Sequence, residues 1–254
     1  MRLHHEVIGR GPDVLLIHGW GLHGGAWSAV PAALARTHRV HVVDLPGHGR
    51  SAGDGSWDLP TLADWLLDVV PPRSTWVGWS LGGFVALAAA RRRPEGVGRL
   101  VLVGTTPRFV RGPDWPCGVA PEVLDEFAST LERDYRATMT RFLSLHLGEG
   151  AAERAALRRL RAEVFRYGEP GMAALRSGLD ILKAADLRAD LPAIEVPTRV
   201  VQGGCDRLAP PAAGAYLVRM LPRAEQYSFA LAGHAPFLSE PEAFARLCRE
   251  ASRV

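Results

Sequence analysis

The sequence has 254 residues, of which 47% are hydrophobic and 22% are charged, and its formal net charge at pH 7 is +3. This composition is that of one ordinary globular unit with a large core, and three widely spaced cysteines indicate neither a disulfide scaffold nor a zinc site. The first apolar run, residues 14–17, is far shorter than the roughly 18 residues of a membrane span or a signal segment, so we expect a soluble protein of the cytoplasm.

Short β-rich runs alternate with helical patterns along most of the chain. The strand-like runs, each closed by Gly, Pro or Asp, are residues 14–17, 40–43, 75–77, 100–103, 198–202 and 226–229. The helical patterns between and after them cover residues 27–37, 61–69, 81–92, 212–221 and 241–252. This alternation is typical of βαβ units, and it predicts an α/β fold with a mainly parallel sheet flanked by helices.

One long stretch interrupts this alternation. No strand-like run appears between residues 105 and 191, where helical patterns at 121–146, 151–167 and 171–183 follow one another. The stretch is too long for a crossover connection. We therefore expect an α/β core made of residues 1–104 and 192–254, with a helical lid inserted at residues 105–191.

A candidate nucleophile lies between the third strand-like run and its helix. The segment Gly78-Trp79-Ser80-Leu81-Gly82 fits G-x-S-x-G, a sharp strand-to-helix turn that exposes a serine hydroxyl. The segment 49–53 fits the same pattern around Ser51, but it continues into a glycine-rich loop. The context favours Ser80 as the nucleophile of a serine hydrolase of the α/β-hydrolase fold.

The base and the acid of such an enzyme follow the nucleophile along the chain, in the order acid and then histidine. Two histidines lie beyond Ser80: His146 falls in the expected lid, whereas His234 lies in a loop between the last strand-like run and the last helix. Asp206 follows the strand-like run 198–202, so its carboxylate is expected at the same sheet edge as Ser80. The sequence predicts a triad of Ser80, Asp206 and His234, in which Asp206 orients the base.

The segment His18-Gly19-Trp20-Gly21 follows the first strand-like run, and its glycines allow the backbone to turn an amide into the cleft. We expect the amides of Trp20 and Leu81 to form the oxyanion hole, since Leu81 directly follows the nucleophile at a helix N-terminus. We interpret His18 as a hydrogen-bonded structural residue. Asp44 precedes Ser80, against the chain order of the triad, so it is also expected to be structural.

The expected lid contains a cationic helix. Arg154, Arg158 and Arg161 recur at spacings of four and three residues, which predicts one basic face. Together with Arg136 and Arg141 this face could bind an acidic protein or a phosphorylated carrier, and a solvated surface explains it equally well. Residues 142–146 offer apolar surface for a hydrocarbon chain, which core packing explains equally well.

Taken together, the motifs resemble those of the pimeloyl-acyl carrier protein methyl ester esterases of biotin synthesis. The resemblance runs nearly end to end and rests on the segments at 18–22, 43–47, 49–51, 78–83, 141–145, 178–183, 186–188 and 234–237. It implies hydrolysis of the methyl ester of a pimeloyl chain carried by acyl carrier protein, with release of methanol and without a cofactor or a metal.

The resemblance also implies roles for individual residues. Trp20 and Leu81 would hold the oxyanion and, with Ser80 and His234, contact the substrate. The acyl chain would be lined by Phe142, Leu143, Ser144, Leu145 and His146. The acidic carrier protein would meet Arg141, Arg154 and Arg158. We expect a monomer that binds neither nucleic acid nor a membrane.

Two other readings stay open on the sequence alone. A broad-specificity short-chain carboxylesterase or a carbon-carbon bond hydrolase of the same fold would use the same triad. A ligand-binding protein that has kept the fold and lost turnover belongs to a different class, and the intact candidate triad argues against it.

Overall fold

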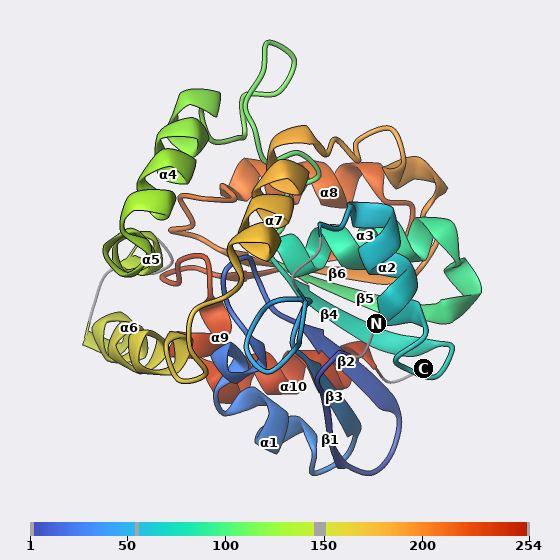
Figure 1. Cartoon of the computed structure of the whole chain (residues 1–254). Helices are drawn as coiled ribbons and strands as arrows, with labels where there is room; N and C mark the ends of the chain where they lie inside the picture. The colour runs from blue at the N-terminus through green and yellow to red at the C-terminus, as the bar shows by residue number, and fades with distance from the viewer. Residues whose placement is uncertain (1–2, 54–55, 145–150, 253–254) are drawn as a thin grey trace.

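The computed structural model describes residues 3–53, 56–144 and 151–252. Within these residues a seven-stranded sheet has the order β1-β3-β2-β4-β5-β6-β7, and helices cover both of its faces (Figure 1). Strands β2 to β7 run parallel to one another, and β1 pairs antiparallel with β3. The predicted α/β fold with a mainly parallel sheet is confirmed.

The strands are β1 (His5–Gly9), β2 (Asp13–Ile17), β3 (Arg39–Val43), β4 (Ser74–Trp79), β5 (Val97–Val103), β6 (Thr198–Gly203) and β7 (Ala224–Phe229). The helices are α1 (Val30–Leu34), α2 (Leu59–Leu67), α3 (Leu81–Arg92), α4 (Pro121–Arg133), α5 (Tyr135–Ser144), α6 (Ala151–Val164), α7 (Met172–Ala184), α8 (Pro211–Met220), α9 (Pro236–Ser239) and α10 (Pro241–Ala251). Short 3-10 turns lie at η1 (Gly24–Trp27), η2 (Pro94–Gly96) and η3 (Leu191–Ala193).

Burial explains why most strands could be predicted from the sequence. Residues 14–17 of β2 have no exposed surface, because helices cover a parallel sheet on both faces and its strands are continuous apolar runs. Strand β1 is different, since it lies at the edge and its residues are half-buried or exposed. Its mixed sequence carries no such run, so the strand is absent from those predicted from the sequence.

The helices are divided between the two faces of the sheet. Helices α1 and α10 pack together below the sheet in Figure 1, whereas α2, α3 and α8 lie above it. Helix α3 is enclosed between the sheet and α2, and its residues 81–90 are all buried. Its glycines and alanines allow this close approach, which fixes the start of α3 against the carboxyl ends of β2 and β4.

Helices α4 to α7 lie between β5 and β6 in the chain, and we call them the helical insertion. The helix expected over residues 121–146 is broken at Asp134, whose Oδ1 accepts a hydrogen bond from the Ala137 amide at 2.9 Å at the start of α5. No helix in the described residues is long and apolar enough to cross a membrane. The division into a core and a lid with the boundaries given above stays a prediction.

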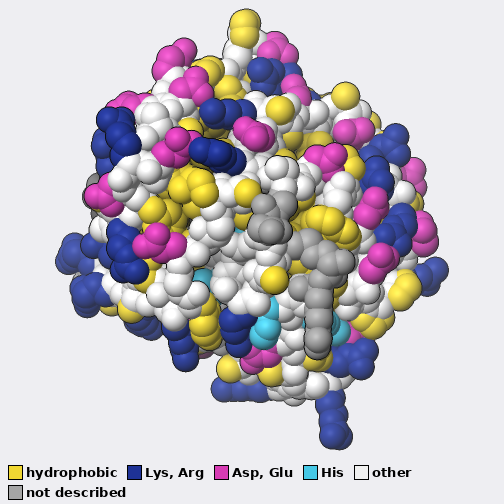
Figure 2. All heavy atoms as spheres, in the orientation of Figure 1, with side chains coloured by type: hydrophobic (Ala, Val, Ile, Leu, Met, Phe, Trp, Pro, Cys, Tyr) yellow, Lys and Arg dark blue, Asp and Glu magenta, His cyan; other side chains and the backbone are white. Residues whose placement is uncertain are grey.

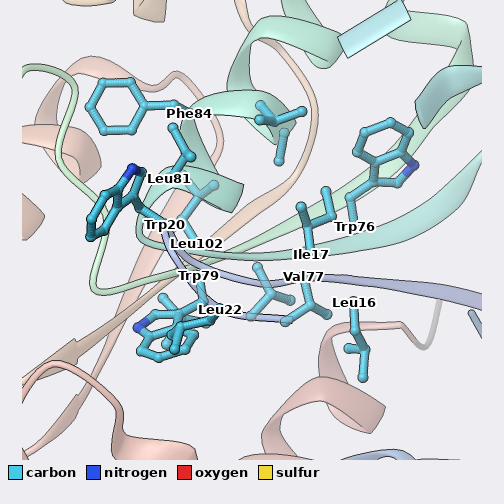
Figure 3. Packing of buried hydrophobic residues seen from close by; sticks show 14 of the residues in the cluster. Leu16, Ile17, Trp20, Leu22, Trp76, Val77, Trp79, Leu81, Phe84 and Leu102 are labelled. Atoms are coloured by element: carbon cyan, nitrogen blue, oxygen red, sulfur yellow. The ribbon is translucent and has the colours of Figure 1, made fainter. Parts of the chain in front are cut away.

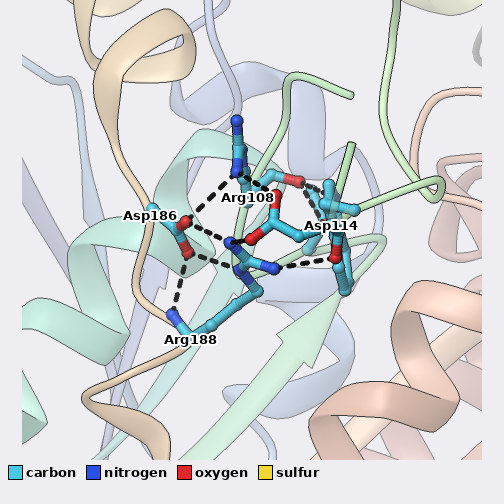
Figure 4. A network of polar contacts seen from close by, with 6 residues as sticks. Arg108, Asp114, Asp186 and Arg188 are labelled. Carbon is cyan, nitrogen blue, oxygen red and sulfur yellow. Dashed lines mark hydrogen bonds and ion pairs between the residues drawn. The ribbon is translucent and has the colours of Figure 1, made fainter. Parts of the chain in front are cut away.

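An ion-pair network ties the two ends of the helical insertion to each other (Figure 4). Arg188 Nη2 lies 2.6 Å from Asp114 Oδ2 and 2.7 Å from Asp186 Oδ2. Arg108 Nη1 approaches the same two carboxylates at 3.2 and 3.4 Å. Arg108 and Asp114 follow β5, whereas Asp186 and Arg188 precede β6, so the network closes the insertion at its base.

Candidate active site

The candidate nucleophile lies on a sharp turn between a strand and a helix. Strand β4 ends at Trp79 and helix α3 begins at Leu81, so the turn consists of Ser80. The backbone angles of Ser80 are φ 53° and ψ −115°, and a positive φ is uncommon for residues other than glycine. Such strain is typical of functional turns, and it raises the half-buried Ser80 side chain at the carboxyl edge of the sheet.

The two glycines of the motif are required by close backbone approach. A Cβ atom at Gly78 would lie 2.4 Å from the Gly82 carbonyl oxygen, and one at Gly82 would lie 2.3 Å from the Ile17 carbonyl oxygen. Larger residues would therefore push α3 away from β2 and β4. The glycine spacing around Ser80 is therefore required by the packing of this turn.

The second match to the same pattern has a different environment. Ser51 Oγ donates a hydrogen bond to the Asp44 carbonyl oxygen at 2.5 Å and accepts one from the His4 amide at 2.7 Å. The Asp44 carboxylate accepts hydrogen bonds from the amides of Gly24 and Arg50 at 2.7 and 2.9 Å. These bonds tie loops together, which agrees with the loop predicted around Ser51 and the structural role predicted for Asp44.

Asp206 and His234 are hydrogen-bonded at the same edge of the sheet. Asp206 follows β6 and His234 follows β7; His234 Nδ1 donates to Asp206 Oδ2 at 2.8 Å, and both side chains are buried. The other carboxylate oxygen, Oδ1, accepts the amides of Leu208 and Ala209 at 2.8 and 2.9 Å. Asp206 is thus fixed by its own loop, and it holds the imidazole with the proton on Nδ1, which leaves Nε2 as the basic nitrogen.

Two residues that the sequence analysis did not single out hold the His234 loop. Trp79 Nε1 donates a hydrogen bond to the His234 carbonyl oxygen at 3.0 Å, and its ring meets Phe237 edge-on at 4.9 Å between centroids. Gly104 has φ 50° and lies against the imidazole, because a Cβ atom there would be 2.9 Å from His234 Nδ1. Trp79 ends β4 and Gly104 directly follows β5. Their place at the carboxyl ends of these strands is the signal in the sequence that could have indicated them.

The loop after β2, which carries the Trp20 amide, lies against the nucleophile. A Cβ atom at Gly19 would lie 3.4 Å from the Ser80 Cβ, and the buried side chains of Trp20 and Leu81 are neighbours (Figure 3). Within the described part of the chain, neither the Trp20 nor the Leu81 amide donates a hydrogen bond. Two uncommitted amides beside a serine are the requirement for an oxyanion hole.

His18 sets the direction of this loop. Its Nε2 accepts the Leu45 amide at 2.9 Å, so Nδ1 carries the proton and donates to the Gly19 carbonyl oxygen at 2.8 Å. Burial holds the pKa of His18 far below its usual range, so the ring is neutral. The structural role predicted for His18 is confirmed. Because the Gly19 carbonyl and the Trp20 amide share one planar peptide unit, His18 also orients the Trp20 N–H.

The residues that the resemblance assigns to the acyl chain have different surroundings. Phe142 is half-buried and meets Trp20 edge-on, with 5.4 Å between ring centroids. Leu143 has no exposed surface, whereas Ser144 is exposed and its hydroxyl donates back to a carbonyl of its own helix. Two further residues of this segment lie outside the described part of the chain, Leu145 and His146. The role of the segment stays a prediction.

The arginines predicted to meet a carrier protein are exposed and form no ion pair with a described carboxylate: Arg141, Arg154 and Arg158. Lys and Arg side chains gather at the left of Figure 2, where Figure 1 has α5 and α6. Arg161, which was predicted to share this face, is half-buried, and its Nη2 donates a hydrogen bond to the Thr140 carbonyl oxygen of α5 at 3.4 Å. Arg136 pairs with Glu169 at 2.9 Å.

A sequence profile of the α/β-hydrolase fold family matches residues 12–241. The pimeloyl-(acyl-carrier protein) methyl ester esterase of Nitrosomonas europaea is 41% identical over 242 residues, which cover 95% of this chain and 96% of that protein. The enzyme of the same name from Chromobacterium violaceum is 41% identical over 250 residues, which cover 98% of each chain. Both alignments include the segments that carry Ser80, Asp206 and His234.

Solved structures of related fold cover nearly the whole chain. An esterase from Exiguobacterium antarcticum superposes with a TM-score of 0.90 at 23% identity, and the match covers 98% of this chain and 94% of that one. An enol-lactonase from Burkholderia xenovorans LB400 superposes with a TM-score of 0.85 at 24% identity, covering 98% and 95%. At these identities the likeness supports the fold alone.

Proposed function

Because the chain belongs to the α/β-hydrolase fold family and, within it, to the pimeloyl-acyl carrier protein methyl ester esterases, we propose that it hydrolyses the methyl ester of pimeloyl-acyl carrier protein in biotin synthesis. The products are methanol and pimeloyl-acyl carrier protein with a free terminal carboxylate. The observation that carries the chemistry is the buried hydrogen bond between His234 and Asp206, at the sheet edge where Ser80 occupies its strained turn.

Ser80 is the proposed nucleophile and His234 the proposed base. The basic Nε2 takes the proton of the Ser80 hydroxyl while Oγ attacks the carbonyl carbon of the ester. The Asp206 carboxylate, hydrogen-bonded at Nδ1, stabilises the imidazolium that forms. The amides of Trp20 and Leu81 donate hydrogen bonds to the former carbonyl oxygen and stabilise its negative charge.

Collapse of the tetrahedral intermediate breaks the bond to the methoxy group. The imidazolium gives its Nε2 proton to the leaving oxygen, so methanol departs and the acyl chain stays on Ser80. Water then loses a proton to Nε2 and attacks the acyl carbon, and Oγ leaves with that proton. These steps move protons and one acyl group, so the proposed reaction uses neither a cofactor nor a metal.

The helical insertion is the proposed lid, with residues 105–191 as its extent. The contact between Phe142 and Trp20 supports a place for the acyl chain along residues 142–146, next to the proposed oxyanion donor. The three arginines on α5 and α6 are exposed, and none of them forms an ion pair with a carboxylate that the structure describes. Both observations support a site for the acidic carrier protein. We propose that the enzyme acts as a cytoplasmic monomer, which gel filtration and cell fractionation test.

Methanol release from pimeloyl-acyl carrier protein methyl ester tests this function directly. Wild type and Ser80→Ala are compared, and the protein product is weighed by mass spectrometry, where hydrolysis removes the mass of one CH2 unit. We expect rapid turnover by the wild type and none above background by Ser80→Ala, with both proteins equally folded by circular dichroism.

Three outcomes distinguish the alternatives. Turnover of the carrier-bound ester through Ser80 supports the proposal. Cleavage of short aryl esters through Ser80, without attack on the carrier-bound ester, leaves a serine esterase with a different substrate. A folded protein that is not labelled by a fluorophosphonate at Ser80 would identify a binding protein without turnover.

A further inference from the structure

The side chain of Trp20 is held by the helical insertion on several sides. Its indole Nε1 donates a hydrogen bond to the Leu175 carbonyl oxygen of α7 at 2.9 Å, and the residue is 2% exposed. One turn further along α7, a Cβ atom at Gly178 would lie 2.4 Å from the indole Cδ1. Only a glycine leaves room there, so α7 packs its backbone directly onto the indole.

Two phenylalanines from the other helices of the insertion complete this enclosure. The Phe127 ring of α4 meets the Trp20 ring at 5.3 Å between centroids and an interplanar angle of 68°, and the Phe142 ring of α5 meets it at 5.4 Å and 89°. The two phenylalanine rings lie 5.3 Å from each other. Both approaches to Trp20 are edge-to-face, the arrangement that aromatic rings prefer. Helices α4, α5 and α7 thus converge on one side chain of the loop after β2.

The backbone around Trp20 is held by few hydrogen bonds within its own loop. Within the described residues this turn is closed by one backbone hydrogen bond, from the Leu22 amide to the Gly19 carbonyl oxygen, which is long at 3.4 Å. Gly21 has φ 71° and contacts the Met139 side chain of α5. His18 fixes the carbonyl end of the peptide unit that contains the Trp20 amide. The other end of that unit is the Trp20 Cα, whose position depends on where the indole is held.

We propose that Phe127 is a positioning residue for the oxyanion hole: with Phe142 and α7 it holds the Trp20 indole, and through it the Trp20 amide. This inference rests on the proposed function, in which that amide donates a hydrogen bond to the oxygen that becomes negatively charged. Its consequence is that the helical insertion supports catalysis on every ester, including those whose acyl group is too short to reach Phe127.

A side chain that only lines the acyl site would behave differently. Its loss would raise KM for long acyl chains and leave short esters unaffected, because binding energy would be removed equally from the ground state and the transition state. Loss of a positioning residue lowers kcat for long and short esters by the same factor, since small displacements of an oxyanion donor cost catalysis.

The test compares wild type, Phe127→Ala and Phe165→Ala on 4-nitrophenyl acetate and 4-nitrophenyl hexanoate. Phe165 is a matched control, because it follows α6 and contacts Tyr135 and Arg136. We expect Phe127→Ala to lower kcat about tenfold on both esters with KM changed less than about threefold, and Phe165→Ala to stay within about twofold of wild type. The inhibition constant of a short alkylboronic acid, whose adduct with Ser80 places an oxygen in the oxyanion hole, should rise in parallel in Phe127→Ala alone.

An effect of Phe127→Ala on KM for the hexanoate ester alone would overturn the inference, as would an equal loss of kcat in Phe165→Ala. If Phe127→Ala does not fold, Trp20→Phe gives the second test, because it removes the hydrogen bond to Leu175 and should also lower kcat on both esters. Absence of Ser80-dependent turnover in the wild type would defeat the proposed function and this inference together. Normal wild-type turnover with an unaffected Phe127→Ala would defeat the inference alone.

Discussion

The two carboxylate oxygens of Asp206 bond different groups: Oδ2 bonds His234, and Oδ1 accepts two loop amides. A single substitution can change the first contact and keep the second. In Asp206→Asn the amide oxygen can still accept the Leu208 and Ala209 amides, whereas the NH2 group would face His234 Nδ1 and force the proton onto Nε2. We expect kcat to fall by about four orders of magnitude, while the melting temperature stays near that of the wild type. Steady-state kinetics on a small ester and a thermal melt measure the two effects.

Asp206→Ala serves as the control, because it removes both sets of hydrogen bonds. It should lose activity to a similar extent and also melt at a lower temperature, since two buried loop amides lose their acceptor. Wild-type kcat in Asp206→Asn would show that another carboxylate orients His234.

His48 makes the stability of the protein sensitive to acid. Its Nδ1 donates to the Pro46 carbonyl oxygen at 2.9 Å, and burial lowers the pKa of the ring to about 4. Since the unfolded chain has a histidine pKa of about 6.5, the unfolded state binds the proton first as the pH falls. The contribution is complete above pH 6.5, and it declines between pH 6.5 and 4 by about 1.4 kcal/mol per pH unit.

Urea unfolding at pH 7.5 and pH 5 tests this dependence. His48→Asn keeps an N–H donor bonded to Cγ for the Pro46 carbonyl and removes the titrating ring. Its free energy of unfolding should therefore fall less between the two pH values than that of the wild type. Identical pH dependence in the two proteins would contradict the assignment. His18, whose pKa is lowered by burial and also by the neighbouring His48 ring, remains in both proteins. Removal of His48 weakens the lowering of the His18 pKa, which reduces the pH dependence of the variant in the same direction.

At the scale of residues, the candidate triad could be predicted from the sequence because its members have a fixed order along the chain. Ser80, Asp206 and His234 each follow a strand-like run, and the chain order of the triad excludes Asp44. Phe127 escapes such reasoning, because nothing in the sequence of α4 indicates which side chain meets Trp20. That contact is set by how separate helices cross in space.

At the scale of elements, the ion-pair network of Figure 4 gives a testable role to Arg188. Its side chain is 18% exposed, bridges two carboxylates and stacks over Trp115 at 5.5 Å. In Arg188→Ala the carboxylates of Asp114 and Asp186 retain Arg108 as their shared cation. Because Asp114 and Asp186 are exposed, we expect a loss of about 1 kcal/mol of stability, which corresponds to a fall of about 3 °C in the melting temperature.

Arg188→Lys is the matched control for this network. Lysine keeps the positive charge but lacks the planar fork that reaches both carboxylates at once, so it should recover part of the loss. An unchanged melting temperature in Arg188→Ala would show that the ends of the insertion are held by other contacts, such as the Leu187 amide to the Pro107 carbonyl oxygen at 2.8 Å.

Strands and helices could be predicted from the sequence where other layers cover them on both faces. The prediction failed for elements that are covered on one side only. The run at 14–17 and the helix at 81–92 are enclosed by other layers, so their apolar patterns are continuous and their limits agree with β2 and α3. Strand β1 lies at the edge of the sheet and mixes polar and apolar residues, so no continuous apolar run marks it in the sequence. The break at Asp134 between α4 and α5 is a local capping event within a stretch that is helical on both sides.

At the scale of the whole molecule, the uneven distribution of exposed arginines should govern the encounter with an acidic carrier. We expect Arg154→Glu combined with Arg158→Glu to lower kcat/KM for the carrier-bound ester by at least tenfold at low salt, because like charges would then meet. The difference should shrink at high salt, where charges are screened. kcat/KM for 4-nitrophenyl acetate should not change.

The matched control reverses two exposed arginines at the opposite end of the sheet, Arg10 and Arg36. Arg10→Glu with Arg36→Glu changes the net charge by the same amount. An equal loss in both double variants would mean that overall charge, and not a site on α5 and α6, attracts the carrier protein.

The backbone at Ser80 also limits which reactions can evolve at this site. Threonine carries a hydroxyl, but a β-branched side chain at φ 53° is strongly disfavoured, so Ser80→Thr would distort the turn instead of preserving the nucleophile. Unbranched cysteine and aspartate fit the same backbone better. A thiol would form a thioester intermediate, and a carboxylate would attack saturated carbon to form an ester on the enzyme. One dihedral angle thus decides which nucleophiles a single substitution can introduce, before any substrate is bound.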